Sequence, residues 1–190
     1  MAEASVSDPA RPVVFTIGHS TRSLEELLSL LAAHGVTAVA DIRTIPRSRR
    51  HPQFGQEALS EALAAAGIAY RHFPGLGGLR KPKPDSTNTG WRHGGFRGYA
   101  DYMQTPAFAR ALHELIEFAA PPHGAGVSRQ IAIMCAEAVW WRCHRQLVAD
   151  ALLVAGWDVR HIVSPAPATT HKLTAFARVS GGTVSYPGLL

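Results

Sequence analysis

Short apolar runs alternate with helix-type patterns along most of this 190-residue chain. Each run has the length and β-branched content of a buried strand, and parallel strands need a helical crossover between them. The predicted strands are Val13–Ile17, Ala38–Ile42, Ala69–Phe73, Gln130–Met134 and Asp158–Val163. The alternation therefore predicts an α/β fold, with a mainly parallel sheet of about five strands covered by helices on both faces.

Helix start and stop signals separate these strands. Ser23–Glu26 is a capping box that opens a helix closed by Gly35, and Thr105 followed by Pro106 is a typical helix start. The other predicted helices are Gln56–Ala66, Tyr99–Gln104, Pro106–Ala119 and Arg142–Ala155. The loop Pro74–Gly95 is long enough to be either functional or poorly ordered, and Thr183–Tyr186 is a candidate short strand.

A chain of this length is expected to form one domain. We expect a flexible N-terminal segment over residues 1–12, an α/β domain over 13–164, and a C-terminal extension over 165–190 that packs on the domain. No run approaches the roughly 20 apolar residues that span a bilayer, the N-terminus lacks a signal-peptide pattern, and two cysteines are too few for a disulfide framework. The sequence therefore predicts a cytoplasmic protein without a membrane partner, and it carries no signal of oligomeric state.

The net charge of +5 and the pI near 9.7 favour an anionic ligand, either a small molecule or nucleic acid. Basic residues cluster after the second strand and in the long loop, at Arg47, Arg49, Arg50, Arg80, Lys81 and Lys83. Trp91 and Phe96 follow, and single-strand nucleic-acid grooves mix aromatics with cations in this way, although a solvated charged surface is the alternative. No motif for a nucleotide cofactor is present, because Gly77-Gly78 is too short for a phosphate-binding fingerprint.

Both cysteines lie in Ile131–Arg145, where the fourth strand is followed by a helix. Cys135 ends the strand, so it is either an activated nucleophile near a helix N-terminus or a small buried hydrophobe. Cys143 repeats with Leu147 and Ala151 at helical spacing, which favours burial.

Charged residues fill the same segment. Glu137 is a candidate general acid or base, or a partner of Arg142 or Arg145 in an ion pair. His144 and Arg145 fall in the predicted first helical turn, where a cation is unfavourable unless an anion compensates it. Arg145 is therefore the predicted anion clamp.

Polar side chains follow each of the other predicted strands. His19 and Ser20 follow the first strand, and Gly18 before them indicates a tight turn in which the backbone approaches a ligand. Asp41 and Arg43 share one face at the end of the second strand, as a salt bridge or as substrate contacts. Because the carboxyl ends of parallel strands meet at one edge, the sequence predicts a site at that edge.

Five motifs, taken together, resemble the domain of unknown function 488 family. They are Thr16–Ser20, Asp41–Arg43 with Pro46–Ser48, Leu76–Gly78, Tyr99–Met103, and Met134–Glu137 with Cys143–Arg145. They cover roughly Val13 to Ser164. The resemblance implies the α/β fold and marks these positions, but it supplies no activity. Many relatives have a proline where this chain has Val139–Trp141.

A fainter, topological similarity links the chain to rhodanese-like sulfurtransferases and cysteine phosphatases. In those enzymes too, a strand ending in cysteine is followed by an arginine-bearing loop and a helix. Their loops are tight anion cradles, whereas the segment between Cys135 and Arg145 contains tryptophan and no glycine.

Metal binding is left open by the sequence. A structural zinc site is disfavoured, because adjacent Cys143 and His144 would diverge by about 100° around a helix. A catalytic divalent metal could be bound by His19, Asp41, Glu137 or His144 from different strand ends.

Two functions from different classes follow. The favoured one is a small enzyme, a hydrolase or transferase, that acts on a phosphate- or nucleotide-bearing substrate; the alternative is a non-catalytic nucleic-acid or nucleotide-binding module. The candidate catalytic residues are Cys135, Glu137, His19 and Asp41. The candidate substrate-binding residues are Ser20, Arg43, Arg47, His144, Arg145, Gly77 and Gly78.

Overall fold

The computed structural model of the chain describes residues 11–47, 49–120 and 129–188. Most of the expected flexible segment 1–12, Ser48 of the second motif, and the last two residues of the C-terminal extension lie outside this range. Within it, no helix is both long and apolar enough to cross a membrane.

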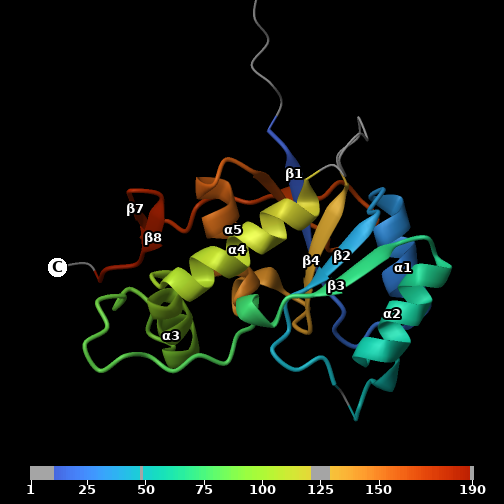
Figure 1. The fold of residues 1–190 in the computed structure, drawn as a ribbon, viewed down its shortest axis with the longest axis horizontal. Coiled ribbons are helices and arrows are strands. Elements are labelled where there is room, and N and C mark those ends of the chain that lie inside the picture. The colour runs from blue at the N-terminus through green and yellow to red at the C-terminus, as the bar shows by residue number, and fades with distance from the viewer. Residues whose placement is uncertain (1–10, 48, 121–128, 189–190) are drawn as a thin grey trace, which may run out of the picture.

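One six-stranded sheet organises the molecule, with strand order β3-β2-β4-β1-β5-β6 (Figure 1). The strands are β1 Val13–Gly18, β2 Ala38–Asp41, β3 Ala69–His72, β4 Ile131–Cys135, β5 Asp158–His161 and β6 Thr169–Thr170. The first five are parallel, which confirms the predicted sheet. The antiparallel sixth strand was not predicted, because its two residues are too short to show a period.

Helices cover both faces of the sheet, as predicted. The helices are α1 Leu24–Ala33, α2 Gln56–Ala65, α3 Gly94–Met103, α4 Pro106–Ala119 and α5 Arg145–Val154, with short 3-10 turns η1 Pro52–Phe54, η2 Pro74–Leu76 and η3 Trp140–Arg142. Figure 1 shows α1 and α2 on one side of the sheet and α3, α4 and α5 on the other. The predicted capping box at Ser23 and the N-cap at Thr105 are both present.

Two helix starts differ from the prediction. The helix α3 begins earlier than expected, at Gly94, because the His93 side chain caps it by accepting a hydrogen bond from the Gly95 amide. The helix α5 begins later than expected, at Arg145, because η3 precedes it and Cys143 is extended. The second difference decides the geometry of the candidate site.

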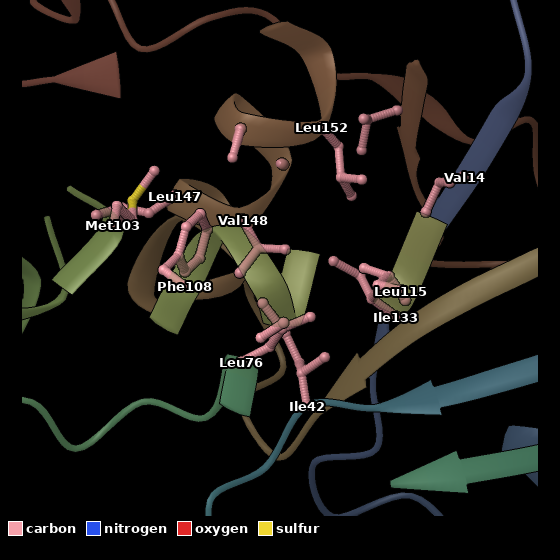
Figure 2. Packing of buried hydrophobic residues seen from close by; sticks show 14 of the residues in the cluster. Val14, Ile42, Leu76, Met103, Phe108, Leu115, Ile133, Leu147, Val148 and Leu152 are labelled. Atoms are coloured by element: carbon pink, nitrogen blue, oxygen red, sulfur yellow. The ribbon is translucent and has the colours of Figure 1, made fainter. Parts of the chain in front are cut away.

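The alternation of side chains along β4 divides the core into two clusters. Ala132 and Met134 face α1 and α2, whereas Ile131, Ile133 and Cys135 face α3, α4 and α5. Figure 2 shows the second cluster, in which side chains of the sheet, η2, α4 and α5 pack together. Cys135 is thereby placed on the same side of the sheet as α5.

The long loop before α3 is held by a buried carboxylate. Asp101 accepts hydrogen bonds from the Lys83 amide, the Ser86 hydroxyl and the Asn88 side chain. Desolvation alone would raise the pKa of Asp101, but these hydrogen bonds outweigh it and lower the pKa. The loop therefore has a fixed path from η2 to α3.

A buried chain of hydrogen bonds joins α5 and β5 to residues near the C-terminus. His171 donates from Nε2 to Asp150 Oδ1 (2.8 Å). Its Nδ1 accepts a hydrogen bond from Nε2 of His161 (3.0 Å). The Thr16 hydroxyl donates to Nδ1 of His161 (2.8 Å). Tyr186 donates to the second Asp150 oxygen (2.8 Å). A hairpin of β7 Arg178–Ser180 and β8 Thr183–Ser185 lies between His171 and Tyr186 in the sequence. The strand β8 corresponds to the short strand predicted in the C-terminal tail.

We expect Asp150→Asn to lower the free energy of unfolding by about 3 kcal/mol, because it breaks a fully buried pair and leaves polar partners unsatisfied. The matched control is Asp158→Asn, which breaks the partly exposed pair with Arg160 and should cost less than about 1 kcal/mol. Urea denaturation of both variants tests this. Equal losses in the two would contradict the role of the buried chain.

Candidate functional site

A cavity of about 420 Å³ opens at the carboxyl edge of the sheet, beyond the ends of β2 and β4. This is the edge that the sequence predicted for the site. Its lining comes from the end of β2, the long loop, the start of α3 and the segment between β4 and α5. The lining residues are Arg43, Thr44, Ile45, Gly78, Leu79, His93, Gly95, Phe96, Tyr99, Cys135, Ala136, Glu137, Arg142, Cys143 and His144.

Two thiols and an imidazole meet in the wall of this cavity. The Nδ1 atom of His144 lies 3.9 Å from Cys135 Sγ and 3.6 Å from Cys143 Sγ. The three potential ligand atoms all lie within 4.8 Å of one another. The prediction that Cys143 and His144 diverge around a helix was wrong, because both precede the first residue of α5.

The protein fixes the orientation of the His144 ring. Its Nε2–H donates to the carbonyl of Ile42 (3.1 Å), so the Nδ1 atom of the neutral ring carries the lone pair. That lone pair faces the two sulfurs. Gly78 packs against the same atom, since a Cβ there would lie 3.0 Å from Nδ1.

The two thiols are electrostatically unequal. The hydrogen bond to Cys143 and burial raise the pKa of Cys135 well above that of a free thiol. The hydrogen bond from Cys135 lowers the pKa of Cys143 well below that of a free thiol, against the effect of burial. Of the pair, Cys143 is therefore the one that ionises first, and it is buried, as its spacing to Leu147 predicted.

The loop after β4 is held in place where its backbone packs closely against the backbone of residues 18–20, a contact called here the backbone crossing. His19 and Ser20 donate backbone hydrogen bonds to the carbonyls of Cys135 and Ala136 (3.0 and 2.8 Å). A Cβ on Gly18 would lie 1.8 Å from the carbonyl oxygen of Glu137, so only glycine fits at this position. The backbone at Gly18 therefore approaches this loop, whereas the sequence had predicted an approach to a ligand.

Arg145 supports the loop from inside. Its guanidinium is 1% exposed and donates to the carbonyls of Glu137 and Ala138. It does not belong to the cavity lining, and its role as an anion clamp stays a prediction.

A second buried group lies at the end of β2. Arg43 pairs with Asp41 through Nε (2.8 Å), and Tyr70 donates to the same carboxylate (2.8 Å). Arg43 also donates to the carbonyl of Phe54 (2.8 Å), and its own carbonyl accepts from His72 (2.8 Å). Of the two interpretations of Asp41 and Arg43, the structure shows the salt bridge, with Arg43 also at the cavity wall.

His19 is part of the same group. Its Nδ1–H donates to the carbonyl of Ser20 (3.0 Å), and its Nε2 accepts from Arg43 (3.3 Å). Burial, with the nearby Arg43 charge, lowers the pKa of His19 to about 4. The ring is therefore neutral at physiological pH and its two nitrogens are engaged within the protein.

The cavity brings together only some of the predicted site residues. Cys135, Glu137, Arg43, His144 and Gly78 line it. The predicted residues outside the lining are His19, Asp41, Ser20, Arg47, Arg145 and Gly77. Gly77 packs on Thr44, where a Cβ would lie 2.6 Å from Oγ1, and Arg47 is exposed.

Several lining residues were not predicted as site residues. Cys143 was assigned to a core stripe, and Phe96, Leu79 and His93 belong to a long loop and helix start whose position depends on tertiary contacts. One sequence signal did mark the region: His144 and Arg145 fall in the predicted first turn of α5, where a cation interacts unfavourably with the helix dipole. The tryptophans Trp140 and Trp141 lie outside the lining, and Trp140 stacks on His161 at 4.0 Å between ring centroids.

We expect Gly18→Ala to destabilise the protein by about 3 kcal/mol or more, because its Cβ would collide with backbone that cannot move without displacing the loop. The matched control is Gly94→Ala, whose Cβ meets nothing within 4 Å. It should be neutral or slightly stabilising, since alanine favours helix over glycine. Thermal and urea unfolding of both variants measure the difference, and a stable Gly18→Ala protein would contradict the crossing.

The neutral His19 predicts a pH dependence of stability. Its pKa of about 4 in the folded state is below the unfolded value of 6.5, so the unfolded chain binds the proton first as the pH falls. Between pH 7 and pH 5 this histidine should cost the native state about 1–2 kcal/mol. His161, with a pKa lowered to about 3 by burial and by neighbouring His171, acts in the same direction.

The test is urea denaturation at pH 7 and pH 5 for the wild type and for His19→Asn. The loss of stability between the two pH values should be smaller in His19→Asn. It should be unchanged in a control, His113→Asn, which replaces an exposed histidine. The same loss in all three proteins would contradict a buried neutral His19.

A comparison with protein families identifies the chain. The family model described as domain of unknown function DUF488 matches residues 23–152, so the chain belongs to this family, as its motifs predicted. Searches of curated proteins and of solved structures each gave no match. The similarity to rhodanese-like enzymes stays a prediction.

Proposed function

We propose that this DUF488 family member is an enzyme that acts on a nucleotide-like substrate, by hydrolysis or group transfer, in the cavity at the carboxyl edge of the sheet. One observation carries the proposal. A single cavity combines cationic side chains, an apolar and aromatic wall, and a cluster of reactive groups with an adjacent carboxylate. A site that only binds phosphate needs few of these groups.

The cationic side chains suit a phosphate group. Arg142 is exposed and lines the cavity. His93 lines it too, and because its Nδ1 accepts the Gly95 amide (3.2 Å), its Nε2–H remains as a donor when the ring is neutral. Arg43 adds charge at the wall while most of its donors hold Asp41, His19 and Phe54.

The apolar wall suits a planar base. Ile45 and Leu79 are exposed at the cavity, and partly buried Phe96 and buried Tyr99 add apolar surface behind them. Leu79 is 83% exposed and has a φ of +54°, a left-handed conformation that costs a non-glycine residue roughly 1–2 kcal/mol. Neither its exposure nor its conformation benefits the fold, and such residues gather at ligand sites.

The reactive groups occupy the part of the wall formed after β4. Glu137 is the only carboxylate among the described residues that line the cavity. Cys135, Cys143 and His144 line the same cavity. A carboxylate beside a bound phosphate ester or glycosidic bond can move a proton to or from the reacting group, which is the role we assign to Glu137.

A non-catalytic nucleic-acid module is less well supported. Its cations exist, because Arg47, Lys81 and Lys83 are exposed. Its stacking platform does not match, because Trp91 packs against Phe96 (4.8 Å between ring centroids) and edge-on against Phe176 (4.9 Å). Single-strand grooves need aromatic faces that are free to stack on bases.

The first test is binding of adenosine monophosphate, with adenosine and inorganic phosphate as its two halves, measured by calorimetry. The wild type should bind the nucleotide more tightly than either half. Arg142→Gln should weaken nucleotide binding about tenfold, because it removes one charge-assisted hydrogen bond. The control Arg110→Gln, at an exposed position of α4, should bind as the wild type does.

The second arm separates catalysis from binding. Chromatography of the four common nucleoside monophosphates after incubation reports turnover, and Glu137→Gln should lower it by about 100-fold or more with little change in affinity. Nucleotide binding without turnover in the wild type would support the binding module. Failure of all four nucleotides to bind would overturn the proposal.

A further inference from the structure

The cluster of Cys135, Cys143 and His144 has the composition of a metal site. Two thiolates and one imidazole are the ligands that favour zinc, and catalytic zinc sites keep three protein ligands and one open position. The three residues come from the end of β4 and the segment before α5, and all three line the cavity. An ion at this place would therefore be reached from the cavity.

The distances fit a tetrahedral ion. With Zn–S bonds of about 2.3 Å and Zn–N bonds of about 2.0 Å, tetrahedral angles place sulfur and nitrogen ligands about 3.5 Å apart. The two sulfurs lie 3.6 and 3.9 Å from His144 Nδ1. Only small side-chain movements would be needed to bring the three atoms around one ion.

The surroundings of His144 provide a second, independent observation. Metal-bound histidines donate their other ring N–H to a carbonyl or carboxylate, which fixes the tautomer and the ring. His144 does this through Nε2 and the Ile42 carbonyl (3.1 Å), leaving the Nδ1 lone pair directed at the sulfurs. A side chain at position 78 would crowd this atom, and Gly78 keeps it open.

From this geometry we infer that Cys135, Cys143 and His144 bind one zinc-type divalent ion, whose fourth coordination position faces the cavity. Binding of the ion would release the thiol protons, and its positive charge would compensate the two buried thiolates that form. A water or a substrate phosphate oxygen takes the fourth position. The catalytic use of the ion, as a Lewis acid beside Glu137, rests on the proposed function; its binding does not.

The probe is cobalt(II), added to the full-length, reduced wild type after treatment with a chelator. We expect one equivalent of cobalt per chain, displaced by zinc. Thiolate ligands should give strong near-ultraviolet charge-transfer absorption, and four-coordinate cobalt should give intense visible bands. Because these spectra come from the wild type, the test does not depend on a variant that folds.

Variants then identify the ligands. Cys143→Ser and His144→Ala should each weaken cobalt binding by at least about tenfold, with loss of charge-transfer intensity in Cys143→Ser. The control His93→Ala, which replaces another histidine of the cavity lining, should keep the wild-type spectrum. Circular dichroism confirms that each variant is folded.

The outcomes separate this inference from the proposed function. Folded, reduced wild type that binds no cobalt, or binds it without thiolate absorption, overturns the metal site, and nucleotide binding in that protein would leave the proposed function standing. Cobalt bound with thiolate bands, but with no response of the visible bands to adenosine monophosphate, supports the metal site and counts against the nucleotide. A Cys135–Cys143 disulfide in place of metal, resistant to reduction in the folded state, also overturns the inference.

Discussion

The site depends on the backbone crossing between the end of β1 and the loop after β4. Hydrogen bonds from His19 and Ser20 extend the pairing of β1 and β4 beyond their last residues. The crossing exists only because position 18 has no side chain, and Arg145 ties the same loop to the start of α5. Since Cys135 precedes the loop and Cys143 follows it, these contacts fix the separation of the two thiols. Without these contacts, the loop would not hold the sulfur atoms of Cys135 and Cys143 close together.

The arginines near the cavity divide into buried and exposed ones. Arg43 and Arg145 are nearly inaccessible. Arg43 pairs with Asp41, and Arg145 donates through Nη2 to loop carbonyls, although its buried Nε has no hydrogen-bond partner among the described residues. Both therefore set geometry. Arg142, which no motif singled out, is the exposed cation of the lining. Helix-dipole reasoning detected that a cation at the start of α5 needs compensation, and the compensating groups are carbonyl oxygens.

The periodicity of the sequence was sufficient to predict the five parallel strands, the two-faced cover of helices and the edge that carries the cavity, because burial alone determines these patterns. It was not sufficient to predict that Cys143 lines the cavity, because its spacing to Leu147 fits a helix, whereas the chain at Cys143 is extended. The 3-10 turn η3 shifts the helix start, and local propensity does not reveal such a shift. Phe96 and His93 were missed for another reason: the Asp101 hydrogen bonds that place the preceding loop are tertiary.

The histidines near the sheet edge show why His144 stands apart. His19 uses both ring nitrogens, one toward the Ser20 carbonyl and one toward Arg43. His161 also uses both, between Thr16 and His171, so these rings complete hydrogen-bond chains and have no site left for a ligand. His144 has one nitrogen held by a carbonyl, while the other meets only weakly hydrogen-bonding sulfur in a cavity wall. A ring that is oriented on one side and open to soft ligands on the other is arranged for coordination, and the fold itself does not need that arrangement.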